Sequence, residues 1–294
     1  MKTLAIVLNP RAGSARAFGE NGLREAIEAA AGWAELEFFD ASDDVPGAAR
    51  AACASGADAV VTAGGDGTAA AVLDAAREAG CTSLMVPLPL GTANMLPHRL
   101  YGDRDFQTVL AELPHYRAVT LHAGQASGRT FYVALMAGVP VHFGQAREAL
   151  RPDGAGRRLS EAFRRLRQGL ASMARAHMRL KLDDGEHRVS RSCALVVAPG
   201  GFAAVRGSAD AAGPAVLEHL MMKPGEPADF AVKTASFLAG LSTPDDAVLL
   251  SRRPAILSGP KRIELMLDGE VFKAKTPVEI SLIENAASFA APAD

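Results

Sequence analysis

The residues best suited to bind phosphate form a glycine-rich turn, Gly64, Gly65, Asp66, Gly67 and Thr68. Residues 57–62, an apolar run, precede the turn and residues 69–78, rich in alanine, follow it, which predicts a buried strand leading into a helix. Glycines let backbone N–H groups approach an anion, and the helix start adds its positive dipole end. Asp66 would repel bare phosphate, so we expect it to face a divalent cation bridging phosphates. An ordinary Gly-Asp-Gly turn is the alternative, because short glycine motifs are weak signals.

Two further turns repeat this arrangement. Residues 4–8 are an apolar run followed by Asn9, Pro10, Arg11 and Gly13, and residues 83–88 are another, followed by Gly91, Thr92, Ala93 and Asn94. Because ligands of an open parallel sheet bind at the carboxyl ends of its strands, we expect all three turns at one edge. The Thr92 hydroxyl and the Asn94 amide could bond phosphate oxygens or metal-bound water, and Arg11 is a candidate planar donor to phosphate.

These motifs, in this order and spacing, resemble the diacylglycerol kinase catalytic-domain family, which includes sphingosine and other lipid kinases. The resemblance rests on Asn9-Pro10-x-x-Gly13, on Gly64 to Thr68, and on Pro89-Leu90-Gly91-Thr92-Ala93-Asn94. A fourth match lies far downstream, where Leu267-Asp268-Gly269-Glu270 and the following Pro277-Val278-Glu279-Ile280 are similar to the family's closing strand-turn-strand.

The resemblance implies an α/β fold: an N-terminal nucleotide-binding domain with a parallel sheet, of the NAD kinase and diacylglycerol kinase type, and a C-terminal β-rich sandwich. It implies transfer of the γ-phosphoryl group of ATP to a lipid hydroxyl, with Mg²⁺, in a cleft between the domains. The loops would hold the phosphates, and Asp66 would serve the metal through water. Glu270 would be the catalytic base, with Asp268 sharing that task or orienting metal-bound water.

Some positions depart from the family pattern. Ala69, Ala70 and Ala71 stand where many relatives carry an Asn-Glu pair, and Met95 stands where they carry Asp, so two polar helpers of metal chemistry are missing. Two alternatives therefore stay open: a non-catalytic nucleotide- or lipid-binding module, and an NAD kinase-like small-molecule kinase. Asp184-Gly185-Glu186 repeats the downstream string and is interpreted as a plain hairpin turn.

The pattern of elements changes near residues 115–130, which predicts a nucleotide-binding domain at 1–122 and a β-rich substrate domain at 123–294. The last strand is a candidate for returning to the first domain. A helix is expected over residues 105–113, and strands over 130–137, 178–182 and 192–198. From Arg157 to Lys181, apolar residues at three- and four-residue steps and many arginines predict a basic amphipathic helix. Such a helix could touch a membrane peripherally or pack between domains.

The amino-acid composition excludes several other classes of protein. With 49% apolar and 22% charged residues the chain is neither disordered nor fibrous, and its formal charge of −2 argues against general nucleic-acid binding. The three cysteines, Cys53, Cys81 and Cys193, are far apart in the sequence and lack metal-ligand spacing, which favours reduced thiols and a cytoplasmic setting. No apolar run approaches the length of a membrane span, so any lipid contact is expected to be peripheral. An oligomer is left open.

Overall fold

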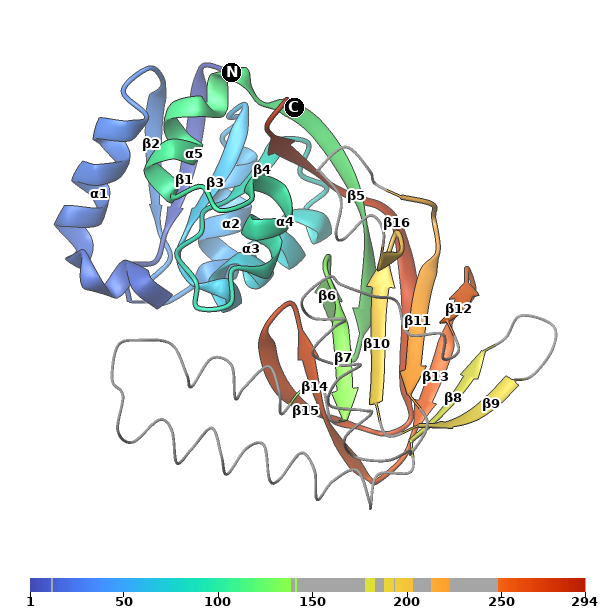
Figure 1. Cartoon of the computed structure of the whole chain (residues 1–294). Helices are drawn as coiled ribbons and strands as arrows, with labels where there is room; N and C mark the ends of the chain where they lie inside the picture. The colour runs from blue at the N-terminus through green and yellow to red at the C-terminus, as the bar shows by residue number, and fades with distance from the viewer. Residues whose placement is uncertain are drawn as a thin grey trace. The chain divides into compact units, whose positions relative to one another are not determined.

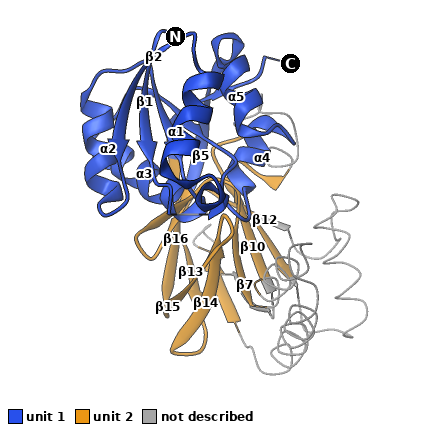
Figure 2. Ribbon diagram, turned by 90° about the vertical axis from the view of Figure 1, so that its left-hand side faces the viewer, with its two compact units in different colours: residues 1–123, 207–212, 284–294 blue, residues 124–206, 213–283 orange. Residues whose placement is uncertain are grey.

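The computed structural model describes residues 1–11, 13–138, 141, 178–182, 188–192, 194–202, 213–222 and 248–293. These residues divide into two compact units, shown in different colours in Figure 2. Unit 1 comprises residues 1–123 and 284–293, and unit 2 comprises the described residues from 124 to 202 and from 213 to 283.

Unit 1 alternates strands and helices along the chain (Figure 1). Its elements are β1 (Thr3–Leu8), η1 (Gly13–Ala17), α1 (Gly19–Ala30), β2 (Glu35–Asp40), α2 (Val45–Ala54), β3 (Ala59–Ala63), α3 (Asp66–Glu78), β4 (Leu84–Pro87), α4 (Met95–Tyr101), α5 (Phe106–Glu112) and η2 (Leu113–His115). β5 (Arg117–Ala126) begins in unit 1 and ends in unit 2, whereas β16 (Val278–Ala291) begins in unit 2 and ends in unit 1.

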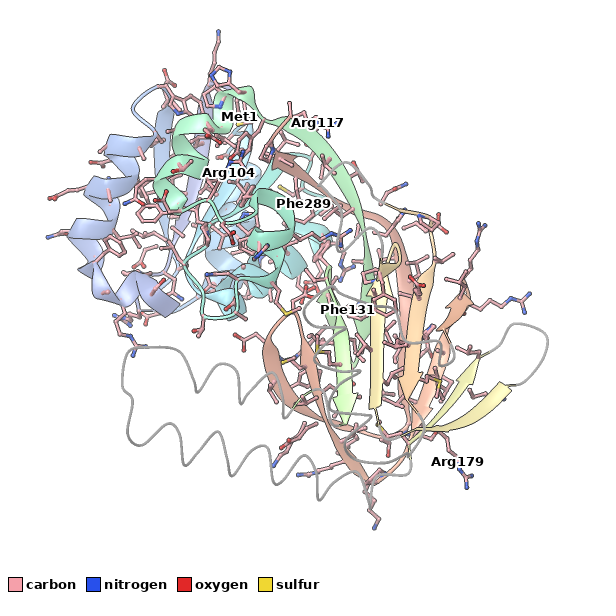
Figure 3. The ribbon with its side chains drawn as sticks, viewed as in Figure 1. Met1, Arg104, Arg117, Phe131, Arg179 and Phe289 are labelled. Atoms are coloured by element: carbon pink, nitrogen blue, oxygen red, sulfur yellow. The ribbon has the colours of Figure 1, made fainter. Side chains whose placement is uncertain are left out.

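The sheet of unit 1 is parallel, in the order β2-β1-β3-β4, and the last residues of β16 pair with β4 through Phe289 and Met85. All five residues of β3 and the last five of β1 are buried, as strands covered on both faces must be. Phe289, labelled in Figure 3, is fully buried. β1 lies between β2 and β3, so the strand order reverses beside it, which is where open α/β sheets bind ligands.

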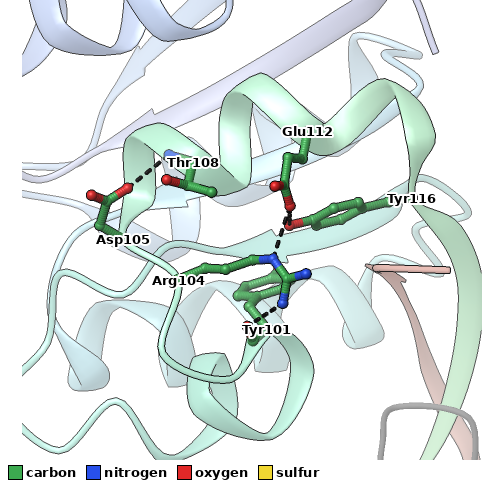
Figure 4. A network of polar contacts seen from close by, with 6 residues as sticks. All are labelled: Tyr101, Arg104, Asp105, Thr108, Glu112 and Tyr116. Atoms are coloured by element: carbon green, nitrogen blue, oxygen red, sulfur yellow. Dashed lines mark hydrogen bonds and ion pairs between the residues drawn. The ribbon is translucent and has the colours of Figure 1, made fainter. Parts of the chain in front are cut away.

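Side-chain caps and one polar network fix the helices of unit 1. Asp105 begins α5 by accepting the Thr108 N–H at 2.8 Å. Arg104, just before it, donates to Glu112 at 2.8 Å and to the carbonyl of Tyr101 at 2.9 Å, and the Tyr116 hydroxyl also reaches Glu112 (Figure 4). The network joins the end of α4 to α5 and to the segment that leads into β5.

Unit 2 is built from antiparallel strands. Those beyond β5 and β16 are β6 (Arg129–Phe131), β7 (Leu135–Gly138), β8 (Met178–Leu182), β9 (Arg188–Ser192), β10 (Ala194–Pro199), β11 (Leu217–Met222), β12 (Val248–Ser251), β13 (Ala255–Ser258), β14 (Arg262–Leu267) and β15 (Glu270–Lys275). One sheet has the order β12-β11-β10-β7-β14-β15, and the other runs β16-β13-β8-β9.

The two sheets of unit 2 face each other across one apolar core. Leu180 and Leu182 of β8 belong to the same buried cluster as Leu195 of β10 and Leu265 of β14. Phe131 of β6 is fully buried in this cluster (Figure 3). The prediction of an α/β domain with a parallel sheet, joined to a β-rich sandwich, is therefore confirmed.

The prediction of one continuous strand over residues 130–137 is wrong, because the structure has two strands there. β6 ends at Phe131 and β7 begins at Leu135, and the amides between them bind a side chain instead of a neighbouring strand. Most of the predicted basic helix, residues 157–177, lies outside the described residues, as do Cys193 and the turn at 183–187. Arg179, labelled in Figure 3, and Lys181, at the end of that stretch, belong to β8 and are exposed. None of the described helices is long and apolar enough to cross a membrane.

Candidate functional site

The turn after β1 is fastened to the turn after β3 by Asn9. The Asn9 backbone N–H donates to the carbonyl of Ala63 at 2.8 Å, and its side-chain Nδ2 donates to the buried Thr68 hydroxyl at 3.1 Å. The Asn9 Oδ1 accepts the Arg11 N–H at 3.2 Å, which closes the turn on itself. The first and second predicted loops therefore meet, as their places in the sheet order require.

Gly13 and Ser14 seat the first loop on the third. Both the N–H and the hydroxyl of Ser14 donate to the carbonyl of Leu90, at 2.8 and 3.0 Å. Gly13 has φ +55°, and a Cβ there would overlap the same Leu90 carbonyl oxygen. A residue with a side chain is excluded at position 13 by both conformation and space.

Asp66, the first residue of α3, holds the third loop with its carboxylate. Its Oδ2 accepts the Ala93 N–H and its Oδ1 accepts the Asn94 N–H, both at 2.8 Å. A Cβ on Gly91 would overlap this carboxylate, so the backbone of the loop passes directly against Asp66. Hydrogen bonds from amides to an ionised carboxylate are among the stronger ones in proteins.

Asn94 closes the third loop. Its Oδ1 accepts the Gly91 N–H at 2.7 Å, and its backbone has φ 48°, a left-handed conformation that Asn tolerates better than most residues. α4 begins at the next residue, and Thr92, between the two bonded ends, is exposed. The loop is thus shaped by its own side chain and held in place by Asp66.

Together these bonds interlock all three turns at the carboxyl ends of β1, β3 and β4. At their centre α3 begins, with Gly65 as its N-cap, and Gly67 in the first turn is exposed. The first N–H groups of a helix have no partner inside the helix, and neither glycine carries a side chain that could block them. The arrangement suits an anion such as a phosphate.

Arg11 and Asp40 border the site on the side of β2. The Arg11 guanidinium lies 3.0 Å from the Asp43 carboxylate, and both side chains are largely exposed. Hydrogen bonds from Ser42, with a smaller effect of Arg11, hold the pKa of Asp40 below its usual range. In the structure, the predicted phosphate donor Arg11 is therefore paired with an acidic side chain.

The loops supply only some of the ligands that a magnesium ion needs. Among the described residues there is no cluster of three or more His, Cys, Asp or Glu side chains able to hold a metal. Mg²⁺ commonly binds through one or two carboxylates, substrate phosphates and retained water, and does not need a full protein cage. Each Asp66 oxygen accepts one N–H and keeps a second lone pair, so a contact through metal-bound water fits the donor set.

The downstream motif lies on a hairpin of unit 2. Asp268 and Gly269 are the two turn residues between β14 and β15, and both have positive φ, 45° and 97°, as the turns favoured in two-residue hairpins require. The Asp268 carboxylate accepts three consecutive backbone N–H groups, those of Tyr132 at 2.6 Å and of Val133 and Ala134 at 2.8 Å. Its own N–H returns a bond to the carbonyl of Ala134 at 3.0 Å.

Glu270 is the first residue of β15, directly after this turn, and its side chain is exposed. Asp268 thus anchors the hairpin to the segment between β6 and β7, and the hairpin carries Glu270. The structure brings the sequence-predicted residues together in two groups: those of the three loops in unit 1, and Asp268 with Glu270 in unit 2.

Sequence reasoning did not identify Ser14 or the amides of residues 132–134 as parts of these sites. Nothing in the sequence around Ser14, apart from its position after Gly13, indicated that it binds the third loop. A signal for the anchor exists in the Asp-Gly pair between apolar strands, because Asp in a tight turn often accepts backbone amides. Its target, 134 to 136 residues away in the chain, could be identified only from the structure.

Comparisons with known proteins agree with this architecture. The family model of the diacylglycerol kinase catalytic domain matches residues 3–126. A crystal structure of a diacylglycerol kinase from Bacillus anthracis str. Sterne is similar, with a TM-score of 0.67 and 17% identity over 98% of this chain and 96% of that one. A second structure from the same strain, provisionally assigned to the same enzyme class, has a TM-score of 0.67 and 16% identity over 98% and 96%. At such identities the likeness concerns the fold. No curated protein sequence matches the chain.

Proposed function

We propose that this chain, whose residues 3–126 match the family model of the diacylglycerol kinase catalytic domain, transfers the γ-phosphoryl group of ATP to the hydroxyl of a diacylglycerol-like lipid. The observation that carries the proposal is the beginning of α3, where Gly65 is the N-cap, Gly67 is exposed, and three interlocked loops surround the first turn of the helix. Phosphoryl transfer depends mostly on positioning and on neutralising charge, which a rigid, backbone-lined anion site supplies.

The phosphates of ATP would lie at the first turn of α3, against the N–H groups beyond Gly65. Asn9, Thr68, Asp66 and Asn94 act mainly on the loops, because each of them bonds to another part of the same three turns. Their contribution to catalysis is then preorganisation, since a site that does not rearrange on binding loses less free energy.

Asp66 would also accept a hydrogen bond from metal-bound water through its remaining lone pairs. When bound, Mg²⁺ would neutralise negative charge on the phosphates during the transfer. Ala69 and Met95 supply no polar atom beside Asp66, so this chain would hold the metal through fewer side chains than many relatives do.

Glu270 would be the general base. The lipid hydroxyl oxygen would attack the γ-phosphorus, the bond from that phosphorus to the β–γ bridging oxygen would break, and the hydroxyl proton would pass to the Glu270 carboxylate. Asp268, whose carboxylate binds three amides, would position the hairpin and would not take the proton itself. This division of roles differs from the sequence expectation, in which Asp268 either shares the task of the base or orients metal-bound water.

The test is a phosphorylation assay with the purified full chain. We would supply Mg²⁺ and γ-labelled ATP with diacylglycerol, monoacylglycerol, a sphingoid base, phosphatidylglycerol or NAD, and separate the products. We expect label in a lipid, and Glu270→Gln should lower that activity by roughly 10²- to 10⁴-fold because it removes the base while keeping the shape. ATP binding, measured by calorimetry, should change little.

The matched control is Glu279→Gln, which neutralises another exposed glutamate of unit 2, on β16. Its activity should equal that of the original chain. Equal activity of Glu270→Gln would exclude Glu270 as the base. Label in NAD alone would favour the small-molecule kinase, and ATP binding without any labelled product would favour the non-catalytic module.

Contact with an anionic lipid surface is part of the same proposal. Arg179 and Lys181 project from β8, and the cations of residues 157–177 precede them in the sequence. Near an anionic surface each cation contributes about 1 kcal/mol. Sedimentation with vesicles should therefore be stronger for vesicles containing phosphatidylglycerol than for neutral ones, and replacing Arg179 and Lys181 by Gln should weaken it.

A further inference from the structure

Two of the three cysteines, distant in the sequence, meet in unit 1. Cys53 is near the end of α2, and Cys81 follows the end of α3. The two helices pack against each other, and the side chains of Cys53 and Cys81 lie near one another. Both are free thiols and both are partly buried.

The backbone around Cys81 is fixed. Its N–H donates to the carbonyl of Ala76 at 2.9 Å, and the N–H groups of Ala79 and Gly80 also bond back to the helix. Cys53 lies in α2, a regular helix that ends at Ala54. Thiols that lie near one another on two ordered segments need little backbone movement to reach disulfide geometry.

We propose that Cys53 and Cys81 form a reversible intramolecular disulfide when the protein meets a peroxide oxidant. The bond would close a loop containing residues 54–80, which includes β3, the Gly64 to Thr68 turn and α3. It would therefore constrain the segment that carries the phosphate-binding turn. The inference goes beyond kinase activity and does not depend on it.

The chemistry balances with hydrogen peroxide as the only co-reactant. The sulfur of Cys81 attacks one peroxide oxygen, the O–O bond breaks, and Cys81 becomes a sulfenic acid while the other oxygen leaves as water. The sulfur of Cys53 then attacks the sulfenic sulfur, the S–O bond breaks, and the hydroxyl leaves with the Cys53 proton as a second water. Two thiols are oxidised and one peroxide is reduced.

The order of these two steps follows from the surroundings of Cys53. Burial, with a smaller effect of the neighbouring Cys81 thiol, raises the pKa of the Cys53 thiol to about 12. Cys53 therefore stays protonated at neutral pH, and a thiol in that form reacts slowly with peroxide. Cys81 is oxidised first, and Cys53 resolves it.

The experiment treats the purified full chain with hydrogen peroxide, blocks remaining thiols with an alkylating agent, and maps linked peptides by mass spectrometry without reduction. We expect one dominant link, Cys53 to Cys81, in the original chain and in Cys193→Ser, and none after dithiothreitol. The melting temperature of the oxidised protein should rise by about 10 °C, because the closed loop restricts the unfolded chain. Cys53→Ser should lose both the link and the rise, and should instead accumulate sulfenic acid at Cys81, detectable with dimedone.

The proposal is overturned if peroxide produces links that involve Cys193 or a second molecule in preference to the pair. It is equally overturned if Cys53 and Cys81 remain fully alkylatable after oxidation. Mapping in the original chain decides between these outcomes even if a serine variant fails to fold. A chain with no kinase activity could still form the bond, so failure of this proposal and failure of the proposed function give different results.

Discussion

Two aspartates, Asp66 and Asp268, each use a carboxylate to bind backbone amides of a distant segment. Asp66 binds the amides of residues 93 and 94, and Asp268 those of residues 132–134. A buried or half-buried N–H without a partner costs free energy, so each acid satisfies groups that the secondary structure leaves over. At this scale both residues shape the structure whatever further part they take in phosphoryl transfer.

Replacing Asp66 by Ala should lower the free energy of unfolding by roughly 2–4 kcal/mol, because two charge-assisted bonds are lost and two amides are left without them. Asp66→Asn, which keeps one oxygen, should have an intermediate effect. The change is measured as a shift of the urea midpoint. Glu78→Ala, at the exposed last position of the same helix, is the control and should stay within about 0.5 kcal/mol of the original chain. Equal midpoints for Asp66→Ala and Glu78→Ala would contradict the anchoring role.

Asp268→Asn tests the second anchor without straining the turn, because Asn tolerates the left-handed backbone that Asp268 adopts. The variant loses the charge and one of the two accepting oxygens, so unit 2 should be destabilised by about 2 kcal/mol. Thermal unfolding with Glu279→Gln as the control measures the change. If the two variants have the same melting temperature, the three hydrogen bonds to the Asp268 carboxylate contribute little to the stability of the fold.

At the scale of elements, three turns that the sequence presents separately form one interlocked body around the start of α3. The parallel register brings the ends of β1, β3 and β4 together, and Gly13 allows the first loop to reach the third. Two side chains likewise fix the beginning of α5, because Asp105 caps the helix and Arg104 binds Glu112 about two turns later.

The same substitution should have opposite effects at two glycines. Gly13→Ala places a Cβ against the Leu90 carbonyl at φ +55° and should cost at least about 2 kcal/mol. Gly22 lies inside α1 with open space around it, so Gly22→Ala should stabilise the protein by roughly 0.5–1 kcal/mol. Urea unfolding of both variants checks the signs. A Gly13→Ala protein as stable as the original would show that the loops are not packed as described.

At the scale of the whole molecule, the two units carry different kinds of core. Unit 1 buries a parallel sheet, and unit 2 buries the space between two antiparallel sheets. His219 of β11 is fully buried, and its neighbours on the same face of the strand are Leu217 and Met221, both members of the apolar cluster. Among the described residues neither ring nitrogen finds a hydrogen-bond partner. Burial lowers the pKa of His219 to about 4.

This histidine should make unit 2 sensitive to acid. Between pH 6.5 and about 4 the unfolded chain binds a proton at His219 and the folded chain does not, so stability falls as the pH drops through this window. The loss of stability attributable to His219 approaches about 3 kcal/mol near pH 4. Above pH 6.5 His219 causes no loss of stability, because it is neutral in both the folded and the unfolded chain. Urea unfolding at several pH values measures it, and His219→Leu should be less sensitive to pH over the same range. An unchanged pH dependence in that variant would assign the acid sensitivity to other groups.

The sequence by itself determined the class of both units, most strand and helix positions, and the glycine turns, because these depend on local periodicity and on conformations that glycine alone adopts easily. It identified Asp66, Asn94 and Asp268 as important. Only the tertiary structure decided what they hold, since their partners are backbone amides, which are alike in every residue and leave no mark in the sequence. The same holds for the proximity of Cys53 and Cys81, which arises because α2 packs against α3. Local patterns fix elements, whereas contacts between distant segments depend on how those elements pack.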